Sequence, residues 1–394
     1  MAKLIEITGK AISGEWGNDD ETGNGIPVLR TTNFTNIGVI NFSNVVTRDI
    51  RKRNISDKFL RNGDIIIEKS GGSDTQPVGR VIFFEAEDNK YLFNNFTGLL
   101  RVIDKNVCFP KYLFYVLFNN YQRGGTIPFQ NKTTGLHNLK IDDYVKSCDI
   151  PLPNIETQKQ IAANLDKVTH TIDLCNTILE KLDLLVKSLF IELFGDPVSN
   201  PMKWGTKSLL SIGKCKNGMN FHYDDSGVEI HCLGVGDFKD LSIITDTTIL
   251  PKISLNEMPN DEYLLQNDDI VFVRSNGNKA LVGRSLAIYP NDTPTTFSGF
   301  CIRFRKDDDS IIVPYLLRVL KTDSIRKKMA GRGANIQNLN QQILSTLEIP
   351  IPPLALQEQF AAFVEQTDKS KLAVKQVLEK AETLKKALMQ EYFG

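Results

Sequence analysis

The sequence lacks the patterns that would indicate a membrane protein, a secreted protein or a metal centre. No apolar run in its 394 residues reaches the roughly 18 that a membrane span needs, and the first residues do not form a signal peptide. Its six cysteines include no C-x-x-C pair, and its four histidines complete no metal-ligand spacing. We therefore expect a soluble cytoplasmic protein, without membrane association, whose cysteines are reduced and mostly buried.

The chain also lacks net charge. It carries 47 Lys and Arg residues against 47 Asp and Glu residues. A protein that binds nucleic acid through overall electrostatic attraction would be basic, because that attraction comes from neutralising phosphates. Any contact with DNA must therefore come from local clusters or be shared with a partner.

Common catalytic motifs are missing as well. No G-x-x-x-x-G-K-[ST] loop occurs, which disfavours an ATP-driven motor, and no N-P-P-Y or D-P-P-Y segment of an adenine methyltransferase occurs. Residues 233–237 read LGVGD, but the matching residues 29–33 contain no glycine, so a tight turn is favoured over a cofactor loop. We therefore expect no cofactor in this chain.

One carboxylate–lysine cluster could be taken for a nuclease site. Asp64, Glu68 and Lys69 have the residue types that bind Mg²⁺ in such enzymes. The matching residues 269–274 keep an aspartate and a basic residue, but Val273 replaces the glutamate. That pattern favours a strand that delivers a cation to a phosphate or a base edge, so we expect no catalytic residue and no metal.

What the chain does contain is an internal repeat. Residues 150–163 read IPLPNIETQKQIAA and residues 349–362 read IPIPPLALQEQFAA, and the match runs without a gap to ELFG and EYFG at the two ends. The segments before each copy match more loosely in the same order, for example FTG at 96–98 with FSG at 297–299. The order is therefore domain, long segment, domain, long segment.

The loosely matching segments are predicted to be β-rich mixed domains. Runs of β-branched and aromatic residues bounded by Gly, Asn and Asp, such as 65–67 and 270–273, predict strands. Residues 112–121 and 315–330 predict helices that begin just after a proline. The predicted class is α+β. The predicted parts are domains at residues 1–150 and 196–349 and long helices at residues 151–195 and 350–394.

The two long segments are predicted to be helices that pair with each other. Residues 156–194 contain no Pro or Gly, so a helix of about 40 residues and about 60 Å can form. Its apolar residues step by three and four, and such a heptad seam needs a partner. Antiparallel pairing of the two copies would relate the domains by a pseudo-twofold axis, and the alternative is that each helix joins another chain. The seam residues are Leu165, Val168, Ile172, Cys175, Leu179, Leu182, Val186, Leu189 and Leu193, then Val364, Val374, Leu378, Ala381, Leu388 and Tyr392, with Leu384 beside them.

Several features together point to a known family. Two domains alternate with two long helices, and each helix opens with I-P-[LI]-P-x-[IL]-x-x-Q-x-Q-[IF]-A-A. The first helix ends in FGDP at 194–197 before Trp204, and a strand ends in RSNG at 274–277. Over essentially its whole length, the chain resembles the specificity subunit of type I restriction-modification enzymes.

The resemblance implies a division of labour. In that family each recognition domain reads one half of a bipartite site in double-stranded DNA, while the helices set the half-site separation and dock two methyltransferase subunits. Those subunits use S-adenosylmethionine to methylate adenine, and restriction subunits, a translocase-nuclease that needs ATP and Mg²⁺, join for cleavage. The two domains differ here, so the resemblance implies an asymmetric target.

Candidate DNA contacts are loops at matching positions in both domains that differ in sequence, because one scaffold could then read two sequences. Residues 69–73 match 274–279, and residues 132–139 match 331–339. A plain turn is the alternative for each loop, and for His137 a hydrogen bond is favoured over a general-base role. The candidates are Arg30, Thr31, Asn33, Lys69, Ser70, Arg80, Lys132, Thr134, His137, Arg274, Ser275, Asn276, Lys279, Arg284, Arg332, Asn335 and Gln337.

Candidate partner contacts lie near the start of each long helix, where amide and small apolar groups suit helix packing. The alternative is that these side chains cap and pack the recognition domain itself. They are Gln158, Ile161, Ala162, Gln357, Phe360 and Ala361.

The sequence thus favours a non-catalytic subunit that reads DNA for partner enzymes. One alternative is a coiled-coil adaptor whose domains bind protein, and sequence-dependent DNA binding would argue against it. The other is a self-contained methyltransferase or nuclease, and inactivity of the purified chain would argue against that.

Overall fold

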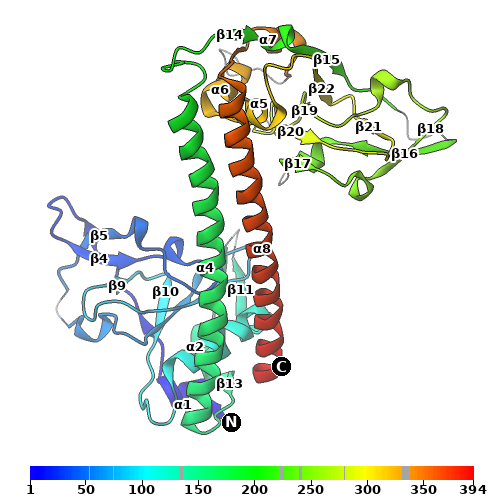
Figure 1. The fold of residues 1–394 in the computed structure, drawn as a ribbon. Coiled ribbons are helices and arrows are strands. Elements are labelled where there is room, and N and C mark those ends of the chain that lie inside the picture. The colour runs from blue at the N-terminus through cyan, green and yellow to red at the C-terminus, as the bar shows by residue number, and fades with distance from the viewer. Residues whose placement is uncertain are drawn as a thin grey trace. The chain divides into compact units, whose positions relative to one another are not determined.

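The computed structural model describes the whole chain apart from residues 53, 74, 134, 135, 222–225, 239–241, 279 and 331–337, and apart from the side chains of residues 132, 133, 136 and 330. The chain divides into two compact units. The first consists of Met1–Cys175 and Gln376–Gly394, and the second of Asn176–Lys375 (Figure 1). Each unit contains β-sheets and helices, which confirms the predicted α+β class.

The first unit is built around β6 (Ile65–Glu68), a strand whose residues are all buried. It lies between β10 (Thr97–Leu100) and β8 (Val81–Phe83), antiparallel to both. Because successive side chains alternate, Ile65 and Ile67 enter one apolar cluster and Ile66 enters another. The other elements are β1 (Ala2–Lys3), α1 (Leu4–Thr8), β2 (Ile12–Ser13), β3 (Asn18–Asp19), β4 (Ile26–Leu29), β5 (Val46–Asp49), β7 (Ser70–Gly72), β9 (Leu92–Phe93), α2 (Pro110–Gln122), β11 (Gln130–Thr133), β12 (Leu136–Leu139), α3 (Ile141–Ser147) and β13 (Asp149–Ile150).

The second unit is built around β19 (Asp269–Val273), which is also buried throughout. It lies between β22 (Cys301–Lys306) and β20 (Ser285–Ile288), again antiparallel to both. The strands predicted at 65–67 and 270–273 are therefore the central strands of the two units. The other elements are β14 (Thr206–Ser208), β15 (Gly213–Asn217), β16 (Val228–Leu233), β17 (Ile243–Ile244), β18 (Lys252–Leu255), β21 (Thr295–Phe297), α5 (Val313–Leu320), α6 (Asp323–Ala330), α7 (Gln341–Ser345) and β23 (Glu348–Pro350).

The short helices correct one prediction. Helix α2 begins at Pro110, as expected for a helix opened by proline. The single helix predicted over 315–330 is wrong, because α5 ends before α6 begins. At the break, the Thr322 hydroxyl donates to the carbonyl of Val319 at 2.7 Å. A Thr side chain that bonds the backbone competes with helical hydrogen bonds, which the apolar pattern alone did not reveal.

Backbone hydrogen bonds also correct one pairing between the repeats. The Asn94 N–H donates to the last residue of β4 at 2.9 Å, and the Ser298 N–H donates to the last residue of β16 at 3.0 Å. Asn94 is thus equivalent to Ser298, and two residues further on Phe96 is equivalent to Phe300. The sequence match of 96–98 with 297–299 is therefore displaced by three residues.

The two long helices pair as predicted. α4 (Ile155–Phe194) and α8 (Leu354–Phe393) each have 40 residues (Figure 1). In the first unit the start of α4 meets the end of α8, where Asn164 Nδ2 donates to the Tyr392 hydroxyl at 3.1 Å. In the second unit the end of α4 meets the start of α8, where the ring centroids of Phe190 and Phe360 lie 5.5 Å apart. Opposite ends meet in both units, which confirms the antiparallel pairing.

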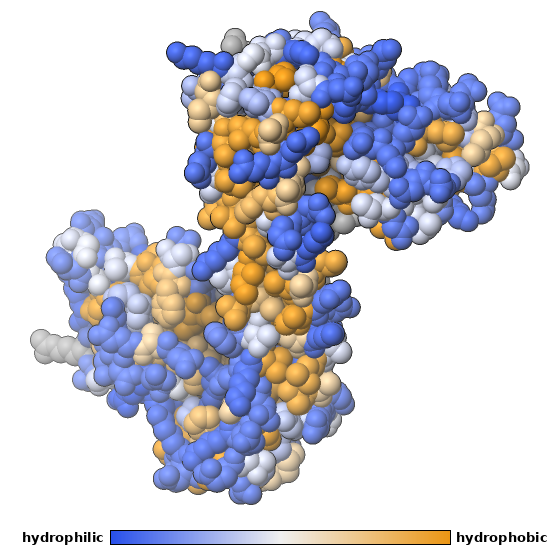
Figure 2. All heavy atoms as spheres, in the orientation of Figure 1, coloured by the Kyte–Doolittle hydropathy of each residue, from blue (hydrophilic) through white to orange (hydrophobic). Residues whose placement is uncertain are grey.

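The helices bury their seam wholly or in part and leave other apolar side chains exposed. Leu165 has no exposure and Val186 has 5%, whereas Leu384, which the sequence placed beside the seam, is 49% exposed. Figure 2 shows apolar residues at the surface along the helices. The exposed apolar side chains on the helices are Leu174, Val377 and Leu384 in the first unit, and Leu184, Leu185, Ile191, Leu354 and Leu372 in the second.

Both units contain the same buried ion pair at the start of the central strand. Arg101 donates through Nε and Nη2 to the two carboxylate oxygens of Asp64, at 2.8 and 2.6 Å. Arg305 donates in the same way to Asp269, at 2.8 Å for each bond. Each carboxylate also accepts the backbone N–H three residues before it, which closes the turn into the strand.

We predict that Asp269→Ala destabilises the second unit. The substitution leaves the Arg305 guanidinium without its charge partner, at a cost of roughly 3 kcal/mol. For a unit of this size that corresponds to about 6–12 °C in Tm, measured by calorimetry. Glu87→Ala, which removes an exposed ion pair with Lys90, is the control and should leave Tm unchanged. Equal Tm values for the two variants would contradict a structural role for the buried pair.

Candidate nucleic-acid interface

In the first unit three segments meet at the end of β6. Lys69 and Ser70 follow the strand, and their backbone N–H groups donate to the carbonyl of Phe96 at 2.8 and 3.2 Å. The Lys69 carbonyl accepts the N–H of Leu139, the last residue of β12, at 2.8 Å. The two loops predicted to contact DNA in this domain therefore share one sheet, in which β12 pairs with both β7 and β11.

The second unit repeats these contacts. The N–H groups of Arg274 and Ser275 donate to the carbonyl of Phe300 at 2.7 and 3.3 Å. The Arg274 carbonyl accepts the N–H of Leu339 at 2.8 Å, and Ser275 forms a bridge with Asn338. Among the described residues of the predicted segments, Arg274, Ser275 and Leu339 thus make the same backbone contacts as Lys69, Ser70 and Leu139.

The phenylalanine at each junction was not among the predicted contacts. Phe96 is 52% exposed and Phe300 is 61% exposed, although each lies in a tight turn held by backbone hydrogen bonds. The sequence search considered charged and polar side chains only, and the displaced pairing hid the equivalence. An F at matching positions before β10 and β22 is the signal that could have found them.

A cavity of about 570 Å³ opens beside Phe96. Its walls combine basic, amide, hydroxyl and acidic groups with an aromatic ring, a mixture that suits a base edge better than a phosphate. Lys69 Nζ donates to the Ser13 hydroxyl at 3.2 Å, and partial burial lowers the pKa of Lys69. The lining includes Lys69, Ser70, Phe96, Asn138, Asp142 and Asp143.

The second unit does not repeat the acidic residues of this lining. Leu139 and Leu339 make the same hydrogen bond, so the residues that follow them correspond along the chain. Asp142 and Asp143 then match Gln342 and Ile343. The two junctions therefore share these backbone hydrogen bonds but differ in the side chains that follow them.

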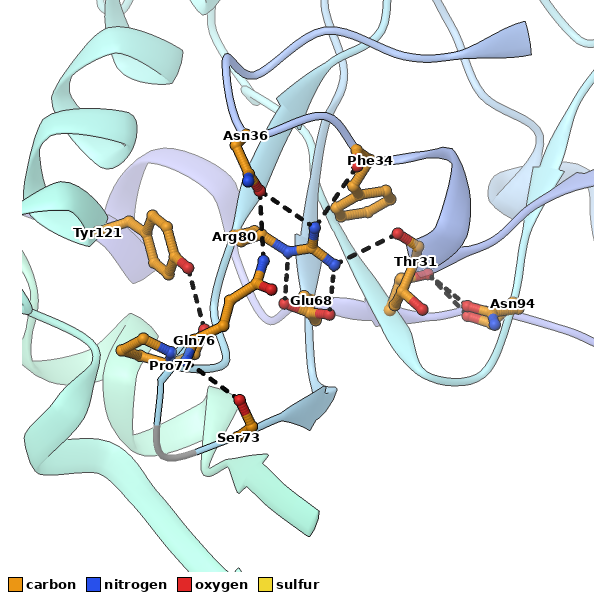
Figure 3. A network of polar contacts seen from close by, with 11 residues as sticks. Thr31, Phe34, Asn36, Glu68, Ser73, Gln76, Pro77, Arg80, Asn94 and Tyr121 are labelled. Atoms are coloured by element: carbon orange, nitrogen blue, oxygen red, sulfur yellow. Dashed lines mark hydrogen bonds and ion pairs between the residues drawn. The ribbon is translucent and has the colours of Figure 1, made fainter. Parts of the chain in front are cut away.

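Another group of candidates lies within the first domain instead of on a loop tip. Arg80 donates through Nε and Nη2 to both carboxylate oxygens of Glu68, at 3.0 and 2.9 Å, and Nη2 also donates to the carbonyl of Thr31 at 3.3 Å (Figure 3). The contact with Glu68 raises the pKa of Arg80. Asn33 is 1% exposed and accepts the N–H of Arg30 at 2.9 Å. The structure gives Arg80 and Asn33 internal roles, and Arg30 and Thr31 take part in the same network.

In the second domain the described candidates are accessible in part. Arg274, Ser275 and Asn276 are half-buried. Arg274 Nη1 donates to the carbonyl of Gly299 at 3.3 Å, which holds its guanidinium beside the turn that contains Phe300. The Arg284 side chain bonds a different segment, because its Nη1 donates to the carbonyl of Phe238 at 3.4 Å.

Other candidates are described incompletely or are mostly buried. His137 is 9% exposed, and its Nδ1 lies 3.3 Å from Gln130 Oε1, so a protein hydrogen bond accounts for this ring. Thr134, Lys279, Arg332, Asn335 and Gln337 lie outside the described residues, as does the side chain of Lys132.

The carboxylates that resemble a nuclease site are occupied by arginines. Asp64 binds Arg101, and Glu68 binds Arg80. No group of three or more His, Cys, Asp or Glu side chains among the described residues could hold a metal ion. Within the same part of the chain, no helix has the length and apolarity to cross a membrane.

The predicted partner contacts at the helix starts are mainly internal. Gln158 has no exposure, and its amide accepts the Phe109 N–H at 2.8 Å and donates to the carbonyls of Val107 and Pro153 at 3.0 and 2.8 Å. Gln357 makes the same three kinds of bond in the second unit. Ala162 and Phe360 have no exposure, while Ile161 and Ala361 are partly exposed. The alternative that these residues pack the recognition domain therefore holds for the four buried ones.

Comparison with known protein families finds the same internal repeat. A family model described as "Type I restriction modification DNA specificity domain" matches residues 2–184 and again 203–383. The Type I restriction enzyme StySPI specificity subunit of Salmonella potsdam is 26% identical over 360 residues, which are 86% of this chain and 75% of that protein. The Putative type I restriction enzyme MjaX specificity subunit of Methanocaldococcus jannaschii is 22% identical over 99% of this chain and 90% of that protein.

Solved structures are similar in fold. The S subunit of a type I restriction-modification system from M. genitalium has a TM-score of 0.62 at 18% identity, covering 100% of this chain and 95% of that one. A chain from work on complex assembly and conformational transition of the type I R-M system has a TM-score of 0.55 at 17% identity, covering 100% and 96%.

The buried side-chain amide of Gln357 allows a test of whether this residue stabilises the fold or docks a partner. Gln357→Ala leaves one backbone N–H and two carbonyls without partners, and we predict a loss of about 3 kcal/mol in the free energy of unfolding, measured in urea. Gln359→Ala, an exposed change two residues along the same helix, should have little effect. A Gln357→Ala protein as stable as the control that fails only to bind a partner would point to docking instead.

Proposed function

This chain belongs to the type I restriction-modification DNA specificity family, and on that basis we propose that each of its two domains reads one half of a split DNA site. The observation that carries the proposal is the repeated junction at the ends of β6 and β19. In each unit a basic residue, a hydroxyl residue and an exposed phenylalanine are fixed by the same backbone bonds. Side chains that vary on a constant backbone are what sequence readout requires.

We also propose that the target is asymmetric. Lys69 in the first domain corresponds to Arg274 in the second, and the flexible ammonium of Lys and the planar guanidinium fork of Arg present different donor geometry to a base edge. Asp142, which can accept a hydrogen bond from cytosine, corresponds to Gln342, which suits adenine. The two half-sites should therefore differ in sequence.

In this proposal the catalytic activities belong to partner subunits. Two methyltransferase subunits would supply S-adenosylmethionine-dependent methylation, and translocase-nuclease subunits would supply ATP- and Mg²⁺-dependent cleavage. The apolar side chains exposed on α4 and α8 support a protein partner on these helices, because each unit leaves several of them open to solvent. They replace the buried residues at the helix starts as the main candidates for docking.

A selection experiment tests the proposed function. The full chain, assembled with its methyltransferase partner, is incubated with random duplex DNA, and the bound sequences are determined. We expect a split motif whose halves differ and are separated by a constant number of base pairs. Recovery of sequences without any shared motif would contradict the proposal.

Arg274 provides a point test within the same experiment. Arg274→Ala should relax one base position in one half-site, by about 1–3 kcal/mol of discrimination, and leave the other half unchanged. Lys252→Ala, an exposed change on β18, is the control and should preserve the motif. Equal weakening of both halves by Arg274→Ala would show that this residue contacts no base.

A further inference from the structure

We infer that Phe96 and Phe300 are aromatic base contacts, one in each half-site. The inference rests on the proposed DNA-reading function and adds an apolar component to a readout so far assigned to polar side chains. The ligand is double-stranded DNA, and the chemistry is contact of a phenyl ring with the face of a base or with the thymine methyl group.

The first argument is recurrence. A single exposed apolar residue is normal in a folded protein and needs no explanation. Here the same residue type stands at the equivalent turn of two domains whose loops otherwise differ, and it is more than half exposed in both. The buried phenylalanines three residues earlier, Phe93 and Phe297, have no exposure, so the exposed rings are not needed to anchor the turn.

The second argument is rigidity. The turn that contains each phenylalanine is closed by an N–H to carbonyl bond, from Thr97 to Asn94 at 3.1 Å and from Cys301 to Ser298 at 2.8 Å. The carbonyl of Phe96 or Phe300 also accepts two further N–H groups. A ring on so constrained a backbone loses little conformational entropy when it binds, which favours its use as an anchor.

The third argument is the neighbourhood. Phe96 lies in the wall of the cavity that Lys69, Ser70 and Asn138 also line, and the Arg274 guanidinium is bonded to the residue before Phe300. A basic or amide side chain bonds a base edge, while a ring beside it contacts a base face or a methyl group. Polar groups beside both rings, including the acidic Asp142 and Asp143 at the first, favour a base edge of DNA over an apolar protein surface as the occupant.

The test measures the affinity of the full chain, assembled with its methyltransferase partner, for the duplex selected by wild type. Phe96→Ala should weaken binding about 5- to 100-fold, the effect of losing one aromatic contact to a base, and should remove the preference in one half-site only. Phe300→Ala should do the same in the other half-site. Phe96→Trp should retain most of the affinity.

Two exposed positions serve as controls. Ile103→Ala in the first unit and Ile249→Ala in the second, where the side chains are 70% and 64% exposed, should bind like wild type. All variants should keep the wild-type Tm, because an exposed side chain contributes little to the core.

Duplexes with 2-aminopurine at single positions report unstacking, and uracil in place of thymine reports methyl contact. These two kinds of duplex therefore distinguish contact with a base face from contact with a methyl group.

Four outcomes would overturn the inference. Wild-type affinity of both Phe→Ala variants would overturn it while the proposed function stands. Equal weakening on selected and random duplexes, or loss of the methyltransferase partner instead of DNA, would assign the rings to another surface. Absence of any selected motif for wild type would remove the proposed function and the inference with it.

Discussion

The placement of each candidate reading site depends on one backbone carbonyl. The oxygen of Phe96 accepts the first two N–H groups after β6, and the oxygen of Phe300 accepts the first two after β19. These bonds involve main-chain atoms alone, so the side chains around them can change without moving the scaffold. The buried central strands hold the donors, and the Asp–Arg pair at the start of each strand fixes its entrance. Two domains of different sequence can thereby present different chemistry at the same place.

Much of the architecture could be predicted from the sequence, because it follows from local rules. The absence of Pro and Gly over residues 156–194 and the three-and-four spacing of apolar residues were enough to predict a 40-residue helix and its pairing. The central strands followed from short buried runs of β-branched residues. The family resemblance predicted from these motifs is confirmed by the match over both halves.

The site was harder to predict, because it depends on contacts between distant residues. From the sequence we predicted that Arg80 contacts DNA, but in the structure its guanidinium pairs with Glu68, twelve residues earlier. Gln is a residue type usually found at the surface, yet the Gln158 side chain is buried and bonds backbone groups about fifty residues before it. The equivalence of Phe96 and Phe300 is set by hydrogen bonds, and a similar-looking FSG three residues earlier obscured it. Side-chain bonds from Arg101 and Arg80 likewise commit Asp64 and Glu68, the carboxylates that suggested nuclease chemistry, to internal ion pairs.

The central claim is that recognition resides in this chain and catalysis resides in other subunits. The most direct measurement is the positions of methylated adenines in DNA from cells that carry this chain with its partner subunits, compared with cells that carry this chain alone. The account predicts one split, asymmetric motif in the first cells and no methylation in the second. Methylation by the chain alone, or a symmetric undivided motif, would contradict it.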